Sequence, residues 1–246
     1  MSKPAIIGVI SQKGGVGKTT IAVNLAMALR MRNYKVLLID GDTSNPSIGI
    51  DIGMEDANRG YKNLLTGKDP VEKLASVHGA SGLHVITGTL QTRPFVPLRS
   101  QVNRLEKKLG KSNFDFIILD TPPGYHTDDE FGFWDEALIV STPDMPAVTA
   151  CLRLEQAFKK ARLKHSLVLN MVKGRRYELR QDEIQDAFEC RIAGVLPADE
   201  AVNAAVAERI PVFLESRNSP FSRAMAKLAA KYGKRGGMSR MLRIGR

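Results

Sequence analysis

The sequence predicts an α/β fold built on a mostly parallel, doubly wound sheet with helices on both faces. Short apolar runs alternate with longer amphipathic segments along the chain, which is the pattern of repeated strand–helix units. The apolar runs are continuous, as in strands that are buried on both faces. The first of them leads through a glycine-rich turn into an amphipathic helix, so a strand–turn–helix unit opens the fold.

The expected elements follow from these patterns in order. Continuous apolar runs predict strands at residues 5–10, 35–40, 82–87, 114–120, 136–142, 166–172 and 191–196. Amphipathic segments between them predict helices at residues 18–31, 60–66, 97–110, 146–163, 178–188, 199–208 and 219–232. Most prolines fall in the expected loops or first helical turns. A glycine-rich break at 233–237 divides the chain into a domain, 1–232, and a short tail, 233–246.

Composition indicates a soluble globular domain. The 246 residues are 43% hydrophobic and 25% charged, enough to bury a substantial core. The two cysteines, Cys151 and Cys190, stand far apart and predict reduced thiols in a cytosolic protein. No apolar run reaches the length of a membrane span or of a signal sequence, so we expect any membrane contact to be peripheral.

The net charge of +10 is concentrated at the C-terminal end. The last sixteen residues carry no acidic side chain and six basic ones, Lys231, Lys234, Arg235, Arg240, Arg243 and Arg246. The rest of the chain holds 30 basic and 26 acidic residues and is nearly balanced. This distribution indicates an anionic partner for the tail, with a solubilising basic end as the alternative.

The segment "SQKGGVGKTT", residues 11–20, predicts a phosphate-binding loop, because it joins the first strand to the first helix. Backbone N–H groups of such a loop converge on phosphates, and glycines let the backbone approach them. Lys18 would neutralise the phosphates and the Thr19 hydroxyl would bind Mg²⁺. The residues expected to contact a nucleotide are Lys13, Gly14, Gly15, Val16, Gly17, Lys18, Thr19 and Thr20.

Aspartates end two of the predicted strands. Asp120 would lie at the carboxyl edge of the parallel sheet, where ligands bind, and could hold Mg²⁺ through water. Asp40 and Asp42 close the second strand at the same edge, and a capping role is the alternative for both. Gly124, in the stiff turn "DTPPG", could sense the γ-phosphate through its N–H group and release a switch segment when that phosphate leaves.

The stretch "KGGVGKTT", 13–20, resembles the deviant Walker A motif of the MinD/ParA family of ATPases, and of its MinD-type members most closely. The resemblance extends in order over most of the chain. Its other blocks are "VLLIDGDTSNPSIGI", "FDFIILDTPPG", "ALIVSTPDMPAVTA", "LVLNMV", and "GVLPADEAVNAAVAERIPV" with "SPFSRAMAKLAAKY". It implies a P-loop NTPase that binds ATP and Mg²⁺ and hydrolyses ATP slowly until a partner protein stimulates it.

The resemblance also implies roles for single residues. Asp42 would help to position the attacking water near the metal, which makes it catalytic together with Lys18. Asn170 would bind the adenine edge, with a loop-capping asparagine as the alternative, and Pro197 would complete the base pocket. Lys13 would reach across a face-to-face homodimer to the partner's nucleotide and stabilise charge there, as an arginine finger does. A solvated loop lysine is the alternative for Lys13.

The tail is amphipathic when it is placed on a helix. One side carries the apolar residues Met238, Met241, Leu242 and Ile244, and the other side carries Arg240, Arg243 and Arg246. This is the pattern of a helix that lies on an anionic membrane surface, and a segment of this type targets MinD proteins to the membrane. Two tails joined in a dimer would bind far better than one. A frayed basic end is the alternative.

These observations predict an ATPase switch that dimerises on Mg·ATP, attaches to membrane and releases after hydrolysis. It would be cytoplasmic, reversibly bound at the inner face of the cell membrane, and would position a division site or a surface machine. The alternative is a ParA-type partition ATPase that binds DNA nonspecifically, which needs basic residues over the folded body. An iron–sulfur carrier would need cysteines suited to a cluster near the dimer interface, which Cys151 and Cys190 do not provide by their spacing.

Overall fold

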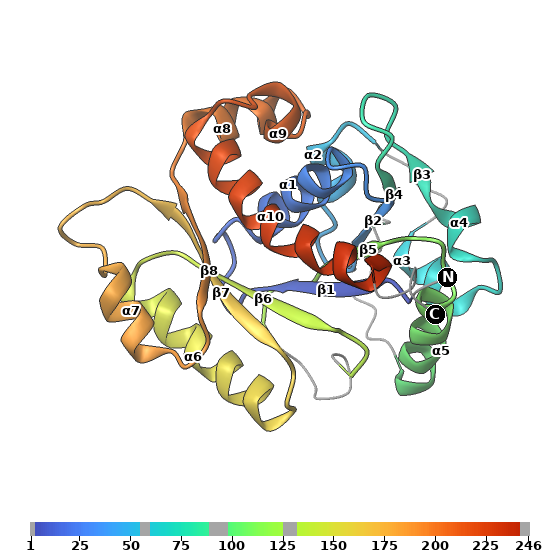
Figure 1. Cartoon of the computed structure of the whole chain (residues 1–246), viewed down its shortest axis with the longest axis horizontal. Coiled ribbons are helices and arrows are strands. Elements are labelled where there is room, and N and C mark those ends of the chain that lie inside the picture. The colour runs from blue at the N-terminus through green and yellow to red at the C-terminus, as the bar shows by residue number, and fades with distance from the viewer. Residues whose placement is uncertain (1–2, 55–59, 89–97, 125–131, 242–246) are drawn as a thin grey trace.

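A computed structural model describes residues 3–54, 60–88, 98–124 and 132–241, and for 234–241 it describes the backbone alone. Helices cover both faces of one eight-stranded sheet (Figure 1). The strands lie in the order β3-β4-β2-β5-β1-β6-β7-β8. Their bounds are β1 Ala5–Ile10, β2 Val36–Asp40, β3 Ser76–Val77, β4 His84–Ile86, β5 Phe116–Asp120, β6 Glu136–Ser141, β7 His165–Val172 and β8 Ile192–Pro197.

All neighbouring strands are parallel except β3, which pairs antiparallel with β4 at one edge. The strand β5 is inserted between β1 and β2, although it follows both in the sequence. Its register pairs Asp120 with Asp40 on one side and with Val9 on the other. The carboxyl ends of three strands therefore meet where the segment after β1 begins, and this meeting point forms the site described below.

The helices form two layers, each with its own apolar core against the sheet. One layer contains α1 Lys18–Arg30, α2 Ile48–Asp51, α8 Glu200–Ala207, α9 Val212–Glu215 and α10 Pro220–Met241. The other contains α3 Tyr61–Thr66, α4 Val71–Leu74, α5 Arg99–Gly110, α6 Met145–Lys160 and α7 Gln181–Ala187. Along β1, Ile7 and Val9 face the first core while Ile6 and Ile10 face the second, so the strand is apolar throughout.

The predicted fold class is confirmed. Each expected strand occurs, and the expected helices begin and end within three residues of their predicted bounds, except at the end of the last one. The elements that were not expected are β3, α2, α4 and α9, which have four residues or fewer. Segments this short are below the length at which a hydrophobic period can be recognised.

The last helix, α10, does not end at residue 232, and in this respect the prediction is wrong. It continues through Gly233, Gly236 and Gly237 to Met241, so the glycines do not interrupt it. Each glycine weakens a helix by about 1 kcal/mol, but only proline removes the backbone hydrogen bond, and no proline follows Pro220.

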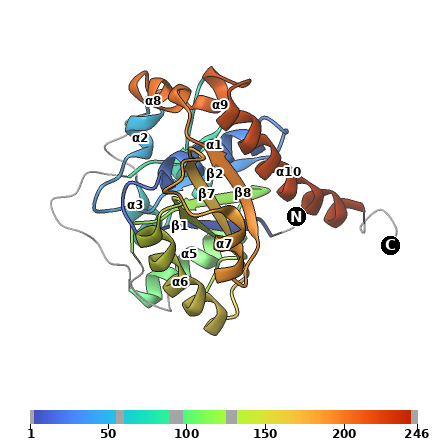
Figure 2. The same ribbon diagram turned by 90° about the vertical axis from the view of Figure 1, so that its left-hand side faces the viewer.

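Contacts with the body hold α10 as far as Gly233. The Tyr34 hydroxyl donates a hydrogen bond to the Gly233 carbonyl at 2.9 Å. Beyond that point the last turns leave the domain (Figure 2). The predicted membrane residues Met238 and Met241 lie on this part of the helix, whereas Leu242 and Ile244 lie outside the described residues. The division into 1–232 and 233–246 therefore stays a prediction. Within the described part of the chain, no helix is both long enough and apolar enough to cross a bilayer.

A close approach within the core gives a test of the fold. A Cβ atom at Gly8 would lie 2.3 Å from the Trp134 ring, so Gly8→Ala forces strand and ring apart. Overpacking of this kind should lower the free energy of unfolding by about 1–3 kcal/mol. Trp134, which is the only tryptophan, reports this in denaturant titrations followed by fluorescence. The control is Gly79→Ala, where a Cβ meets nothing within 4 Å, and equal losses in both variants would contradict the packing.

Candidate nucleotide-binding site

The loop between β1 and α1 has the backbone that a phosphate site needs. Gly15 and Gly17 have positive φ angles of 78° and 83°, which favour glycine. A Cβ at Gly17 would lie 2.3 Å from the Asn170 amide nitrogen, so this position also excludes side chains sterically. A Cβ at Gly14 or Gly15 would meet nothing within 4 Å, which leaves open space over the loop. The N-terminus of α1 opens into that space without a side-chain cap from Gly17.

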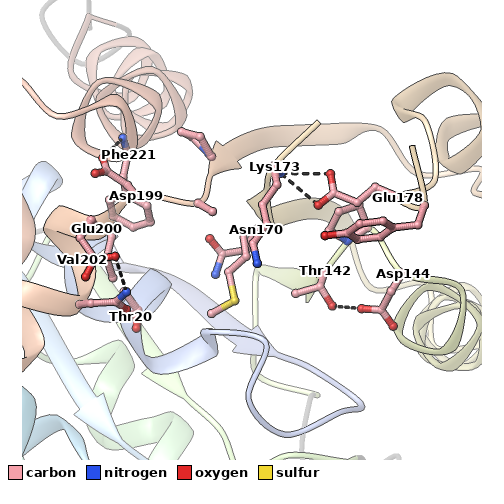
Figure 3. Close-up of a pocket in the computed structure, with 16 residues that line it drawn as sticks. Thr20, Thr142, Asp144, Asn170, Lys173, Glu178, Asp199, Glu200, Val202 and Phe221 are labelled. Atoms are coloured by element: carbon pink, nitrogen blue, oxygen red, sulfur yellow. Dashed lines mark hydrogen bonds between the residues drawn. The ribbon is translucent and has the colours of Figure 1, made fainter. Parts of the chain in front are cut away.

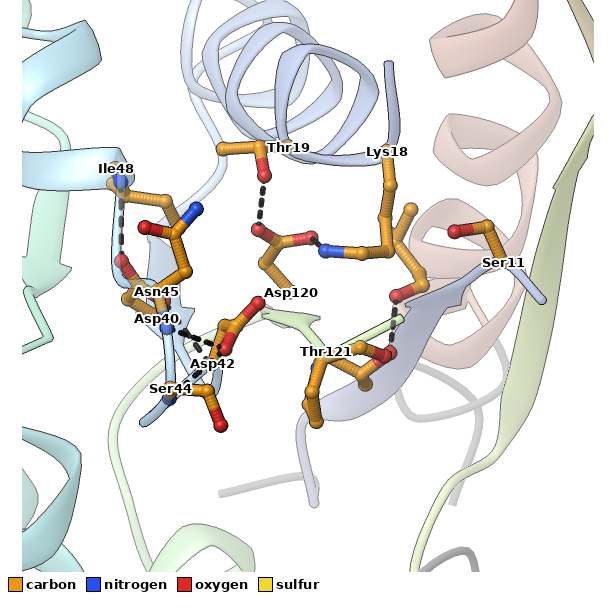
Figure 4. Close-up of polar contacts among 12 residues, drawn as sticks. Ser11, Lys18, Thr19, Asp40, Asp42, Ser44, Asn45, Ile48, Asp120 and Thr121 are labelled. Atoms are coloured by element: carbon orange, nitrogen blue, oxygen red, sulfur yellow. Dashed lines mark hydrogen bonds and ion pairs between the residues drawn. The ribbon is translucent and has the colours of Figure 1, made fainter. Parts of the chain in front are cut away.

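Two adjacent residues at the start of α1 hold the carboxylate that ends β5. The Lys18 Nζ atom lies 2.8 Å from Asp120 Oδ1, and the Thr19 hydroxyl donates to Asp120 Oδ2 at 2.7 Å (Figure 4). Both partners of the ion pair are buried, with side-chain exposures of 8% and 1%. The predicted phosphate-binding lysine and two of the predicted metal ligands, Thr19 and Asp120, therefore meet at one point.

Two further carboxylates lie beside this pair. Asp40 accepts backbone hydrogen bonds from Asp42 at 3.1 Å and Ile48 at 3.0 Å (Figure 4). Burial, and then the nearby charge of Asp120, raise the pKa of Asp40 to about 7. Burial also raises the pKa of Asp120, and the charge of Lys18 offsets part of this effect. The site therefore holds more negative than positive groups and favours protonation of Asp40.

These residues fit a magnesium ion and the phosphates that accompany it. Mg²⁺ takes oxygen ligands, and the Thr19 hydroxyl with the Asp42 and Asp120 carboxylates would provide them, directly or through water. Asp42 is buried, and its Oδ1 atom accepts the N–H groups of Ser44 and Asn45 at 3.0 and 2.9 Å, which fixes its orientation. The ion would supply the positive charge that Lys18 alone does not provide for three buried carboxylates.

A cavity of about 570 Å³ adjoins the loop and has the size of small-ligand pockets (Figure 3). Asn170 and Pro197, both predicted for the base, line it together with Thr20. The Asn170 amide donates to the Val16 carbonyl at 2.9 Å, so it also ties β7 to the phosphate loop. The geometry thus gathers the predicted base residues beside the predicted phosphate residues.

Lys13 and Gly124 have other partners in this structure. Lys13 Nζ lies 3.5 Å from Asp144 Oδ1, and its side chain is 52% exposed. The Gly124 N–H group donates to the Ser11 carbonyl at 2.9 Å, so it bonds to the phosphate loop itself. The roles predicted for Lys13 and Gly124 toward a nucleotide stay predictions.

Sequence reasoning placed the segment 197–199 at the base pocket but missed other residues that line the cavity. Asp144 accepts the Ala147 N–H as the N-cap of α6, and Asp199 accepts the N–H groups of Ala201 and Phe221. Both follow the carboxyl end of a strand, and this signal could have found Asp144 as well. Tyr177 and Glu178 come from the loop after β7, where no pattern marks them.

Comparison with known proteins identifies the family of this chain. A sequence model of the ParA family, described as "NUBPL iron-transfer P-loop NTPase", matches residues 3–232. The chain belongs to the ParA family of P-loop NTPases. An uncharacterised ATP-binding protein of Methanocaldococcus jannaschii is 32% identical to this ParA-family chain over 231 residues, which cover 92% of the chain and 86% of that protein.

Two MinD proteins are also similar to this ParA-family chain. The septum site-determining protein MinD of Thermotoga maritima is 30% identical over 243 residues, which cover 92% of the chain and 87% of that protein. The solved structure of MinD from Pyrococcus horikoshii in complex with Mg-ADP is 26% identical, with a TM-score of 0.86 and coverage of 96% of this chain and 98% of that one. The predicted resemblance to MinD and ParA ATPases is confirmed.

The raised pKa of Asp40 predicts how the metal-free chain responds to pH. Its folded pKa of about 7 exceeds the ordinary aspartate value of 3.8, so the folded chain binds the proton more tightly than the unfolded chain does. The stabilisation is complete below pH 4 and is lost as the pH rises to 7, which lowers the free energy of unfolding by about 3 kcal/mol. Other groups add their own pH dependence, so the test compares variants.

Denaturant titrations in chelator between pH 4.5 and 8 measure this change. Asp40→Asn carries no titrating proton and should lose less stability over the same range. Asp115→Asn is the matched control, because Asp115 accepts the Lys35 N–H at an exposed position on the opposite edge of the sheet. A pH dependence of Asp40→Asn equal to that of the original chain would contradict the role of Asp40.

Proposed function

We propose that this chain is a MinD-like ATPase switch. It dimerises on Mg·ATP, binds an anionic membrane through the end of α10 and releases after hydrolysis, in the spatial positioning of a division site or a surface machine. The observation that carries the proposal is that Lys13 of the phosphate loop is exposed, whereas the other lysine of the loop, Lys18, is buried against Asp120. One loop thus offers one lysine to its own site and one to solvent.

The residues of the site would divide the work of hydrolysis. Lys18 would exchange its contact with Asp120 for the β- and γ-phosphates, and Asp120 would turn to the metal together with Thr19. Mg·ATP supplies the phosphoryl group and the charge that orients it. Asp42, fixed by the Ser44 and Asn45 N–H groups, would orient the attacking water. Asn170 and Pro197 would hold the base in the cavity.

Lys13 is available to a second copy of the chain, because its present contact is weak. Both side chains of its ion pair with Asp144 are about half exposed, at 52% and 42%. Exposed pairs of this kind contribute about 0–1 kcal/mol. A triphosphate presented by a second chain would compete easily with Asp144, since it offers more charge in a less hydrated interface. ATP would then join two copies, and hydrolysis would loosen them.

The protruding end of α10 supports the membrane step. The helix is anchored to the body up to Gly233 and extends to Met241 beyond it (Figure 2). The sequence of this end combines basic residues with an apolar side. Each basic residue near an anionic surface contributes about 1 kcal/mol, so a single chain would bind weakly and a dimer with two ends would bind well.

The description of the family names iron transfer, and the two cysteines show whether this chain could hold an iron–sulfur cluster. Cys151 is buried in the first half of α6, near the carboxyl edge of the sheet. Cys190 lies before β8, at the amino edge. Burial raises the pKa of both thiols, that of Cys190 to about 12. Because these are the two cysteines of the chain, it has no pair of neighbouring, reactive thiols for a shared iron cluster.

The trans role of Lys13 is tested by Lys13→Ala. We expect ATP-dependent dimerisation, measured by light scattering, to be lost, and ATP hydrolysis to fall by roughly 10²-fold or more, as for other losses of charge stabilisation in a transition state. Lys35→Ala, which removes an exposed lysine at the opposite edge of the sheet, should leave both unchanged. If Lys13→Ala dimerises and hydrolyses ATP normally, Lys13 acts only as a solvated loop residue.

The membrane step is tested by co-sedimentation with anionic liposomes and with plasmid DNA, in ATP and in ADP. The full chain should pellet with liposomes in ATP, and a chain ending at Gly233, which keeps the Tyr34 contact, should not. Leu242→Gln with Ile244→Gln keeps every basic residue and should weaken liposome binding roughly tenfold or more, because apolar insertion is lost. Liposome binding that survives truncation overturns the mechanism, and ATP-dependent binding to DNA alone supports the partition ATPase.

A further inference from the structure

Three segments bring a glutamate, a histidine and a cysteine together at the edge of the sheet opposite the phosphate loop. Glu155 lies toward the end of α6, His165 begins β7, and Cys190 lies in the turn before β8. The ligand atoms of these side chains all lie within 4.8 Å of one another. No sequence motif joins them, since the fold alone makes them neighbours.

The histidine is oriented as a metal ligand would be. Its Nδ1 atom lies 2.7 Å from the Leu163 carbonyl oxygen, which can only accept, so Nδ1 carries the hydrogen. Metal-binding histidines commonly donate their second ring N–H group in this way. Nε2 then presents its lone pair toward Glu155, 3.9 Å from Oε1. Two acceptors that face each other are stabilised by a proton or a cation between them.

The other two residues are held equally firmly. The Glu155 side chain is only 6% exposed and accepts the backbone N–H of Cys190 at 2.8 Å. The side chain of Gln185 donates to the Cys190 carbonyl at 3.0 Å and accepts the Ile192 N–H at 3.0 Å, which fixes the turn on both sides of the cysteine. Cys190 is partly exposed, so the cluster is open to solvent on its side.

We propose that Glu155, His165 and Cys190 bind a divalent transition-metal ion of the zinc class, with water in a fourth position. Imidazole nitrogen, thiolate sulfur and carboxylate oxygen are the donors that such ions prefer, whereas Mg²⁺ and Ca²⁺ prefer oxygen. Tetrahedral zinc places its donor atoms about 3.5 Å apart, so small side-chain rotations suffice to close the site. The thiol proton leaves when the sulfur binds the ion.

The ion would join three elements that also reach the candidate nucleotide site. At their other ends, α6 begins beside Asp144, β7 carries Asn170 and β8 ends at Pro197. Occupation of the metal site would therefore fix the far ends of the elements that line the base cavity. Its chemistry does not depend on the function proposed above, because no residue of the cluster lines that cavity.

Cobalt titration of the chelator-treated full chain tests the proposal. A thiolate–cobalt charge-transfer band in the near ultraviolet should rise to one ion per chain, and one equivalent of Zn²⁺ should abolish it. The band does not report an ion at Thr19 and Asp120, since that site contains no sulfur. Cys151→Ser leaves Cys190 as the one thiol and should keep the band, whereas Cys190→Ser should lose it.

Two substitutions with one matched control complete the test. His165→Gln and Glu155→Gln should each weaken cobalt binding beyond the ~10–100-fold that loss of an outer-sphere partner costs. Glu189→Gln removes the same charge next to Cys190, but Glu189 is 74% exposed and pairs with Lys159, so binding should persist. Circular dichroism confirms that each variant is folded. Absence of the band from Cys151→Ser at millimolar cobalt, or its persistence in Cys190→Ser, overturns the proposal.

Discussion

The buried ion pair between Lys18 and Asp120 is the interaction on which the candidate site depends. Removing two charges from water costs several kcal/mol for each ion, and the cost is recovered only with close geometry and further hydrogen bonds. The 2.8 Å contact and the Thr19 hydroxyl at 2.7 Å meet that requirement. Because Lys18 begins α1 and Asp120 ends β5, the pair also ties the phosphate loop to the neighbouring strand.

The same ion pair leaves the site with an excess of negative charge. Asp40 and Asp42 lie beside Asp120, and a single buried lysine faces the three carboxylates. A low-dielectric site responds either by taking up a proton, as the raised pKa of Asp40 indicates, or by taking up a cation. The divalent-ion binding proposed for this edge and its tendency to bind a proton therefore have one physical cause.

The carboxyl and amino edges of the sheet present different kinds of ligand group, although some helices and strands reach both edges. At the carboxyl edge, oxygen ligands and a phosphate loop suit a hard ion and a nucleotide. At the amino edge, Glu155, His165 and Cys190 suit a softer ion. Helix α6 and strands β7 and β8 run between the two, so each of them contributes to both places. Helix α10 leaves the body on the face that also holds α1.

The sequence alone determined the fold class, most of the element bounds and the phosphate loop. Buried parallel strands need continuous apolar runs, and a loop with positive φ angles needs glycine at positions such as Gly17, so both leave local signals. The pattern did not reveal that α10 continues past Gly233, because glycine weakens a helix without ending it. The pattern likewise gave no sign of α2, α4 and α9, because a helix of four residues is too short to show a hydrophobic period.

Only the tertiary structure decided which polar groups meet and in which state. The insertion of β5 between β1 and β2 sets Asp120 against both Lys18 and Asp40, and the resulting burial raises the pKa of Asp40. The pairing of β6 with β1 brings Asp144 to Lys13, and the pairing of β7 with β8 helps to bring Cys190 next to His165 and Glu155. Local sequence specifies backbone propensity and burial pattern, whereas contacts between residues far apart in the chain depend on strand order, which no local signal encodes.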